Sequence, residues 1–152
     1  MKRLTYDIIF IVAFFVPTFF FQGCVKDPVT KDVTPLYPEG VVMLDSANFT
    51  SKLTVPGLIA MVDFFSPMCD SCKKFDDTIK VIAQLYKDKA LIGKVNCLQN
   101  DTLRNAFLSC IDEYPNLIFF SSGKAVKCKH GVMPVEKAAN ILDSLLASVA
   151  PQ

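Results

Sequence analysis

Residues 62–75 read VDFFSPMCDSCKKF, and they decide the fold of this 152-residue chain. The apolar run Leu58–Phe65 has the length and near-continuous hydrophobicity of a strand that is buried on both faces. After it, apolar residues recur at the three- and four-residue spacing of an α-helix, at Phe75, Ile79, Ile82 and Leu85. The pattern therefore places a Cys-X-X-Cys pair, Cys69 and Cys72, where a buried strand ends and a long helix begins.

The position at the start of a helix predicts a reactive thiol. Unpaired backbone N–H groups and the positive end of the helix dipole stabilise a thiolate there. Such placement, with a second Cys three residues on, can lower a thiol pKa from about 8.5 to roughly 3.5–7.5. We therefore expect Cys69 to be the attacking thiolate and Cys72 the resolving thiol that closes the disulfide.

Two other uses of a Cys-X-X-Cys pair fit the sequence less well. Zinc usually takes four ligands from Cys and His, but the chain has a single His, His130, and no second Cys-X-X-Cys, so we expect no metal site. A structural disulfide that closes a two-residue loop would stabilise almost nothing. Redox chemistry remains, and it needs no organic cofactor because the dithiol itself carries two electrons.

The rest of the chain, residues 41–150, alternates between strand and helix signals. Strands are expected at Val41–Leu44, Ala90–Asn96, Leu117–Phe120 and Ala125–His130. Helices are expected from a Ser46 cap to about Leu53, over Asp101–Phe107, and from Pro134 through Val149. The resulting order, β-α-β-α-β-α-β-β-α, implies an α/β sheet with helices on both faces.

The order of motifs resembles that of the thioredoxin superfamily. Residues 62–75 are similar to its active-site segment, Lys94-Val95-Asn96 to its third strand, and Ile111–Pro115 to the stretch that ends in its cis-Pro loop. A strand–turn–strand and Gly131 then follow in the family order. The resemblance covers about residues 41–150 and implies a thioredoxin fold, with a mixed central β-sheet flanked by helices on both faces.

The resemblance implies roles for two charged residues near the thiols. Asp63, at the family's buried acid position, would accept a proton from Cys72 through a water molecule, and burial in an apolar strand should raise its pKa. Lys94 would lie near Asp63 and modulate its charge. The alternatives are a polar core residue for Asp63 and a solvated side chain for Lys94.

The same resemblance implies a substrate-binding surface made by Pro115, Tyr114 and Met68. Pro115 would be the cis-Pro that faces the thiols and leaves the neighbouring backbone free to pair with a substrate strand. Met68 departs from the family, which normally has Trp there, and the chain contains no Trp. Asp70 is a second departure. Its negative charge opposes formation of a Cys69 thiolate, whereas the positive charges of the lysines after Cys72 favour it. The sequence does not decide which of these opposite effects on the Cys69 pKa is larger.

The resemblance implies a thiol–disulfide oxidoreductase that exchanges disulfides with protein substrates and with an upstream redox partner. Its direction stays open, because oxidase, reductase and isomerase differ by the reduction potential of one disulfide, for which about 30 mV equals 1.4 kcal/mol. The alternatives are a redox-weak binding module of the same fold and a metal-handling protein. A net charge of +1 without a run of Lys or Arg gives no reason to expect a nucleic acid partner.

Three of the six cysteines remain for structure. Cys97 and Cys110 are one possible disulfide, and buried free thiols are the other possibility. Cys128 shares strand parity with Val126 and His130, so we expect it to be a core residue. His130 is expected to be structural.

Residues 1–23 have the pattern of an export signal. A basic start precedes the apolar run Ile8–Phe21, whose 14 residues fall short of the roughly 20 that span a bilayer as a helix. This run holds six of the 13 Phe, and without residues 1–23 the chain has 14 positive and 14 negative charges. A membrane-spanning anchor is the alternative.

The signal ends in Phe21-Gln22-Gly23-Cys24, which resembles in part the lipobox of bacterial lipoproteins. We therefore expect a lipid on Cys24 that attaches the exported protein to a membrane, in the periplasm or at the cell surface, with residues 24–40 as an extended tether. An incidental Cys near a cleavage site is the alternative for Cys24. The alternative for localisation is the eukaryotic secretory pathway, since Asn48 and Asn100 stand in glycosylation sequons.

Overall fold

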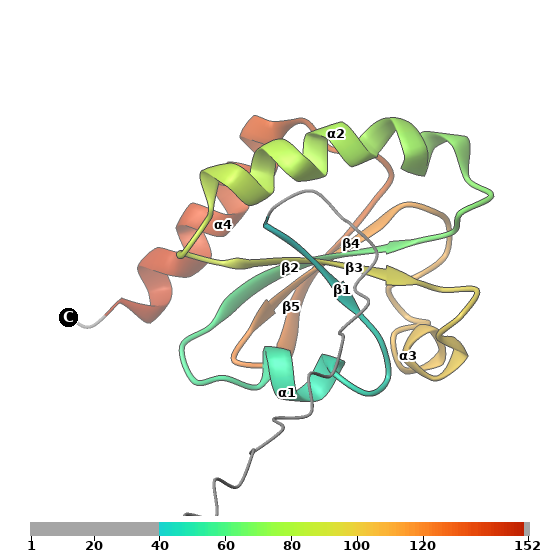
Figure 1. The fold of residues 1–152 in the computed structure, drawn as a ribbon. Helices are drawn as coiled ribbons and strands as arrows, with labels where there is room; N and C mark the ends of the chain where they lie inside the picture. The colour runs from blue at the N-terminus through green and yellow to red at the C-terminus, as the bar shows by residue number, and fades with distance from the viewer. Residues whose placement is uncertain (1–39, 151–152) are drawn as a thin grey trace, which may run out of the picture. The chain divides into compact units, whose positions relative to one another are not determined.

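The computed structural model describes residues 40–150 (Figure 1). The predicted export signal, Cys24 and all of the predicted tether except Gly40 lie outside the described residues. Within residues 40–150, no helix is long and apolar enough to cross a membrane.

The sheet is built around its central strand β2 (Ile59–Phe65), in which every residue is buried. On one side β2 pairs in parallel with β3 (Leu91–Asn96), and on the other it pairs antiparallel with β4 (Asn116–Ser121). The edges are β1 (Val41–Leu44), parallel to β3, and β5 (Lys124–His130), antiparallel to β4. The continuous apolar run in the sequence reflects this burial on both faces.

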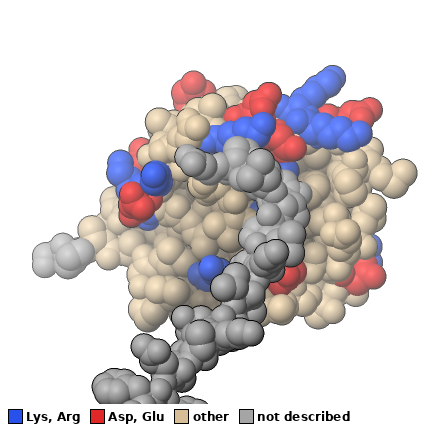
Figure 2. Space-filling model, in the orientation of Figure 1, with Lys and Arg blue, Asp and Glu red and all other residues tan. Residues whose placement is uncertain are grey.

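Helices cover both faces of the sheet (Figure 1). On one face lie α2 (Asp70–Leu85) and α4 (Val135–Val149), and on the other lie α1 (Phe49–Leu53) and α3 (Asp101–Ala106). Positive and negative side chains are intermixed over α2 on the face drawn in Figure 2. The predicted element order and the predicted mixed sheet with helices on both faces are confirmed.

Alternation along β2 divides the core in two. Ile59 and Met61 pack with α2 and α4, whereas Ala60, Val62 and Phe64 pack with α1 and α3. Asp63 follows Met61 by two residues, so it lies on the face that α2 covers. The strand thus carries one carboxyl group into the core beneath the helix that bears the thiols.

The first helix begins later than predicted. Ser46 is not its cap, because α1 begins at Phe49 with Asn48 at the cap position. The Asp45 carboxylate accepts the backbone N–H groups of Ala47 and Asn48, each at 2.9 Å. These bonds form a turn that precedes the helix.

The apolar face of α2 ends on Tyr86, at the helix cap, and the prediction that Leu85 belongs to it is wrong. Leu85 is 54% exposed, whereas Tyr86 is 5% exposed. The Tyr86 hydroxyl donates a hydrogen bond to the Asp143 carboxylate of α4 at 2.8 Å. A tyrosine ring is buried here because its polar end finds a partner.

A disulfide joins Cys110 to Cys128. It decides between the two possibilities left open for Cys97 and corrects the prediction for Cys128. Cys110 does not pair with Cys97, which is a buried free thiol. Cys128 is not a core residue, because β5 is a largely exposed edge strand and Cys128 is only half-buried on it. Its sulfur instead crosslinks β5 to the loop that follows α3.

This crosslink should contribute to stability. It closes a loop with a sequence separation of 18 residues, for which chain entropy predicts about 3 kcal/mol. We expect the double variant Cys110→Ser/Cys128→Ser to lose about that free energy of unfolding, measured by chemical denaturation in a background that lacks Cys69 and Cys72. In that background, reductant should destabilise only the protein with the crosslink. Equal stability with and without reductant would contradict the prediction.

Candidate active site

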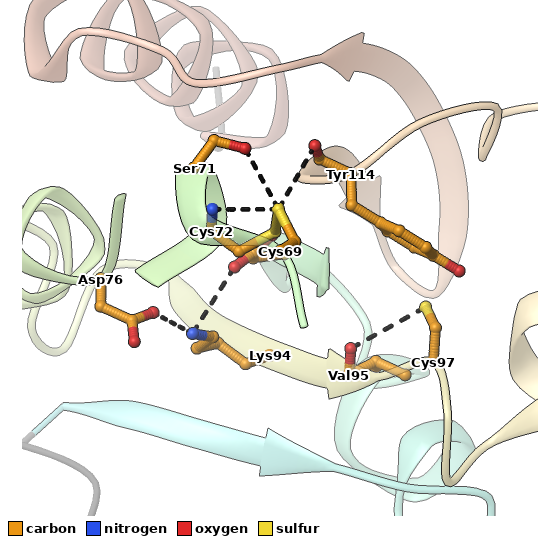
Figure 3. Close-up of polar contacts among 9 residues, drawn as sticks. Cys69, Ser71, Cys72, Asp76, Lys94, Val95, Cys97 and Tyr114 are labelled. Atoms are coloured by element: carbon orange, nitrogen blue, oxygen red, sulfur yellow. Dashed lines mark hydrogen bonds and ion pairs between the residues drawn. A yellow bond between two sulfur atoms is a disulfide. The ribbon is translucent and has the colours of Figure 1, made fainter. Parts of the chain in front are cut away.

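Cys69 and Cys72 form a disulfide at the start of α2. Cys69 is the N-cap residue, with an extended backbone (φ −90°, ψ 115°), and its Sγ accepts the backbone N–H of Cys72 at 3.1 Å (Figure 3). The sulfur therefore takes the place of the oxygen that usually caps a helix. The same N–H is placed to stabilise a Cys69 thiolate once the disulfide is reduced.

The two sulfur atoms differ in access. Cys69 is half-buried, whereas Cys72 is 2% exposed. A substrate can approach Cys69 from solvent, but Cys72 is buried within the first turn of the helix. This asymmetry fits the predicted attacking and resolving roles.

Ser71 adds a contact that the sequence analysis missed. Its hydroxyl lies 3.1 Å from the Cys69 Sγ and can donate a hydrogen bond to a thiolate there (Figure 3). The signal that could have found it is a hydroxyl residue within the Cys-X-X-Cys segment.

The Asp70 carboxylate, which was expected to oppose the thiolate, is paired with Lys73 at 3.2 Å. Both side chains are exposed, so solvent screens the pair and the two charges largely offset each other. The local stabilisation of a Cys69 thiolate therefore comes from hydrogen-bond donors at the helix start.

The predicted cis-Pro loop faces the thiols. The Tyr114–Pro115 peptide bond is cis, and the Tyr114 carbonyl oxygen lies 3.6 Å from the Cys69 Sγ (Figure 3). Pro115 is buried and Tyr114 half-buried, and the Tyr114 phenol points toward Cys97 (Figure 3). Met68 is 82% exposed directly before Cys69, so it presents an apolar side chain beside the half-buried sulfur.

Asp63 and Lys94 are both buried beneath α2. Lys94 is 3% exposed rather than solvated, and its Nζ lies 3.7 Å from Asp63 Oδ2. Among the described residues, neither Asp63 oxygen has a hydrogen-bond donor. Burial raises the Asp63 pKa from 3.8 to about 7, an effect that the positive charge of Lys94 partly opposes and the negative charge of Asp76 increases.

The part of the chain that the structure describes holds no cluster of three or more His, Cys, Asp or Glu side chains arranged to bind a metal. His130, the one His of the chain, lies on β5 with its Nδ1 2.5 Å from the Asp112 carboxylate. It therefore joins the cis-Pro loop to the edge strand.

Comparison with known families decides the relationship. The thioredoxin family model matches residues 40–144, which include the thiols, the buried carboxyl group and the cis-Pro loop. The chain belongs to the thioredoxin family. Its membership and its Cys69–Cys72 pair make it a thiol–disulfide oxidoreductase.

Relatives within the thioredoxin family support this assignment. Thioredoxin 1 of Synechococcus elongatus is 30% identical over 100 residues, which are 66% of this chain and 92% of that protein. The thioredoxin of Griffithsia pacifica is 36% identical over 88 residues, 58% of this chain and 79% of that one. Protein disulfide-isomerase like 2-2 of Arabidopsis thaliana is 32% identical over 88 residues, which are 58% of this chain and only 19% of that protein.

A solved structure confirms the thioredoxin fold. A mutant thioredoxin from Halobacterium salinarum superposes with a TM-score of 0.62, over 72% of this chain and 93% of that one. The two sequences are 17% identical, so this likeness supports the fold alone.

The raised pKa of Asp63 predicts a pH-dependent stability. Because the unfolded carboxyl ionises near 3.8 and the folded one near 7, the folded protein binds more protons between these values. The free energy of unfolding should therefore fall as the pH rises through this range, in total by roughly 4 kcal/mol, since one pKa unit is worth about 1.4 kcal/mol. In the oxidised protein, Asp63→Asn should remove this decline of the free energy of unfolding with rising pH. Denaturation at a series of pH values measures it.

The matched control is Asp77→Asn, which removes an exposed carboxylate from α2. It should leave the decline in stability as it is in the parent protein. An unchanged decline in Asp63→Asn would mean that Asp63 does not titrate in this range.

Proposed function

We propose that this protein exchanges disulfides with protein substrates through a mixed disulfide on Cys69, which Cys72 resolves. The observation that carries the proposal is the difference in access, since Cys69, the more exposed of the two cysteines, is also the one whose sulfur has hydrogen-bond donors for a thiolate. The names of the thioredoxin relatives support protein thiols and disulfides as the substrate class.

In the reducing direction, the Cys69 thiolate attacks one sulfur of a substrate disulfide. A Cys69–substrate disulfide forms, and the other substrate sulfur leaves as a thiolate. Cys72 then gives its proton to the Asp63 carboxylate and attacks Cys69, which releases the second substrate thiolate and leaves the Cys69–Cys72 disulfide. Two electrons pass to the substrate, and the oxidising direction runs the same steps in reverse.

Asp63 suits the role of proton acceptor in this scheme. A group accepts protons best when its pKa lies near the working pH, and burial raises the Asp63 pKa to about 7. Asp63 lies on the sheet face that α2 covers, the same side on which Cys72 is buried. A water molecule between them would carry the proton.

Substrate binding would use the loop that faces Cys69. The Tyr114 backbone adjoins the Cys69 sulfur, and the exposed Met68 side chain offers an apolar contact beside it. An extended substrate segment can pair with the backbone of this loop, as in other cases of strand addition. An upstream redox partner would use the same surface to restore the pair.

The scheme predicts that Cys72→Ser traps substrates. With no resolving thiol, the Cys69–substrate disulfide should accumulate, and a fluorescent disulfide-linked peptide should stay bound in non-reducing electrophoresis. Cys69→Ser is the control, because it keeps the buried thiols of Cys72 and Cys97. Capture by Cys72→Ser that does not exceed this control would favour a binding module of the same fold.

We also propose that the protein is exported and held at a membrane by a lipid on Cys24, in the periplasm or at the cell surface. The basic start, the short apolar run and the Gly23-Cys24 pair support an export signal with a lipid attachment site. Residues 25–40 would then separate the thioredoxin domain from the membrane surface.

The lipid proposal predicts the mass of the mature protein. It should begin at Cys24 and carry a diacylglycerol adduct, detected by intact-mass spectrometry of the membrane fraction. The variant Cys24→Ala should carry no lipid adduct. It should be found either in the soluble fraction or as a protein whose signal has not been cleaved. A mature protein that begins elsewhere without lipid would overturn the proposal.

A further inference from the structure

Lys94 is shared between two carboxylates that come from different elements. Its Nζ donates a hydrogen bond to the Asp76 carboxylate of α2 and lies 3.7 Å from Asp63 Oδ2 of β2 (Figure 3 draws Asp76 and Lys94). The distance to Asp63 exceeds that of a hydrogen bond. The ring of Phe65, 4.2 Å from the Nζ at its centroid, borders the ammonium on another side.

The charges of this cluster do not balance when all three groups are ionised. Two carboxylates and one ammonium leave one net negative charge, and burial disfavours an uncompensated charge. The Asp76 side chain is 40% exposed and is solvated in part, whereas the Asp63 side chain is 0% exposed. Asp63 is therefore the member of the cluster that takes up a proton most readily.

Other groups near Asp63 do not compensate the charge. Besides Lys94 of β3 and Asp76 of α2, the titratable neighbour of Asp63 is the Cys97 thiol that follows β3. Cys72 of α2 is held in the disulfide with Cys69 and does not titrate in this state. The register partner of Asp63 on β4 is Leu117, and α4 contributes apolar side chains to this face. Asp76 is thus the carboxylate that competes with Asp63 for the buried Lys94 ammonium.

We propose that Asp76 is a positioning residue that holds the Lys94 ammonium out of hydrogen-bond contact with Asp63 and so keeps Asp63 able to accept the proton of Cys72. Without Asp76, the ammonium and Asp63 would form a charge-balanced pair. Such a pair holds a carboxylate in its ionised form and makes it a weak proton acceptor. The functional part of this inference rests on the proposed role of Asp63 in the resolving step.

The test is the titration of the Asp63 carboxyl group, followed by carboxyl-carbon NMR in the oxidised protein. In Asp76→Asn, two changes lower the Asp63 pKa: a nearby negative charge is lost, and the Lys94 ammonium is free to approach Asp63. We expect the Asp63 pKa to fall by about one unit, a tenfold loss of proton affinity. Asp76→Glu keeps the negative charge, so the Asp63 pKa in this variant should stay close to that of the parent protein.

The matched control is Asp77→Asn, one residue further along α2. Asp77 pairs with Lys80 at 2.9 Å on the exposed surface, so this variant removes the same charge without touching the cluster. An Asp63 pKa that is unchanged in Asp76→Asn, or that falls equally in Asp77→Asn, would overturn the proposal.

A kinetic measurement separates this inference from the proposed role of Asp63. In single-turnover release of a thiol from a Cys69 mixed disulfide, the low-pH limb of the rate should disappear in Asp63→Asn and move to lower pH in Asp76→Asn. If the limb survives in Asp63→Asn, the role of Asp63 as proton acceptor fails. The NMR titration still decides whether Asp76 controls the Asp63 carboxyl group.

Discussion

The complete burial of β2 is the constraint on which the rest of this structure depends. Because the strand pairs on both edges and is covered on both faces, its side chains have no route to solvent. Residues of that strand form both halves of the core, and its carboxyl end leads directly to Cys69 at the start of α2. The same burial that orders the fold makes the one charged residue of the strand, Asp63, unusual in its acidity.

Stability and chemistry therefore oppose each other at Asp63. A buried carboxyl group without a hydrogen-bond donor lowers the free energy of unfolding once it ionises, and a hydrophobic residue of similar size would avoid that cost. The nearby Lys94 reduces the cost only in part, since its ammonium is bonded to Asp76. The arrangement suits the proton-acceptor role proposed for Asp63, because a group in that role must be tolerated in both its charged and its neutral forms.

The parts of the fold that depend on local pattern can be predicted from the sequence. The buried strand, the helix at Cys69 and the order of elements follow from hydrophobic spacing, and resemblance to the family supplied the cis bond before Pro115. Contacts between distant elements could not be predicted in this way. Nothing local distinguishes Cys128 from Cys97 as the partner of Cys110, because the pairing depends on where the edge strand lies. The Asp76–Lys94 contact likewise depends on how α2 is rotated above β3.

The cis-Pro loop shows how these distant contacts act together at the site. Its start is tied to β5 by the Cys110–Cys128 disulfide and by the contact of Asp112 with His130. Its end is tied to the same region, since the Gly131 backbone N–H donates to the Pro115 carbonyl at 2.8 Å. A loop held at both ends keeps its backbone in one conformation, which would reduce the entropy lost if a substrate binds there as proposed. The edge strand β5, although mostly exposed and remote from Cys69 in the sequence, therefore supports the surface that the reactive sulfur faces.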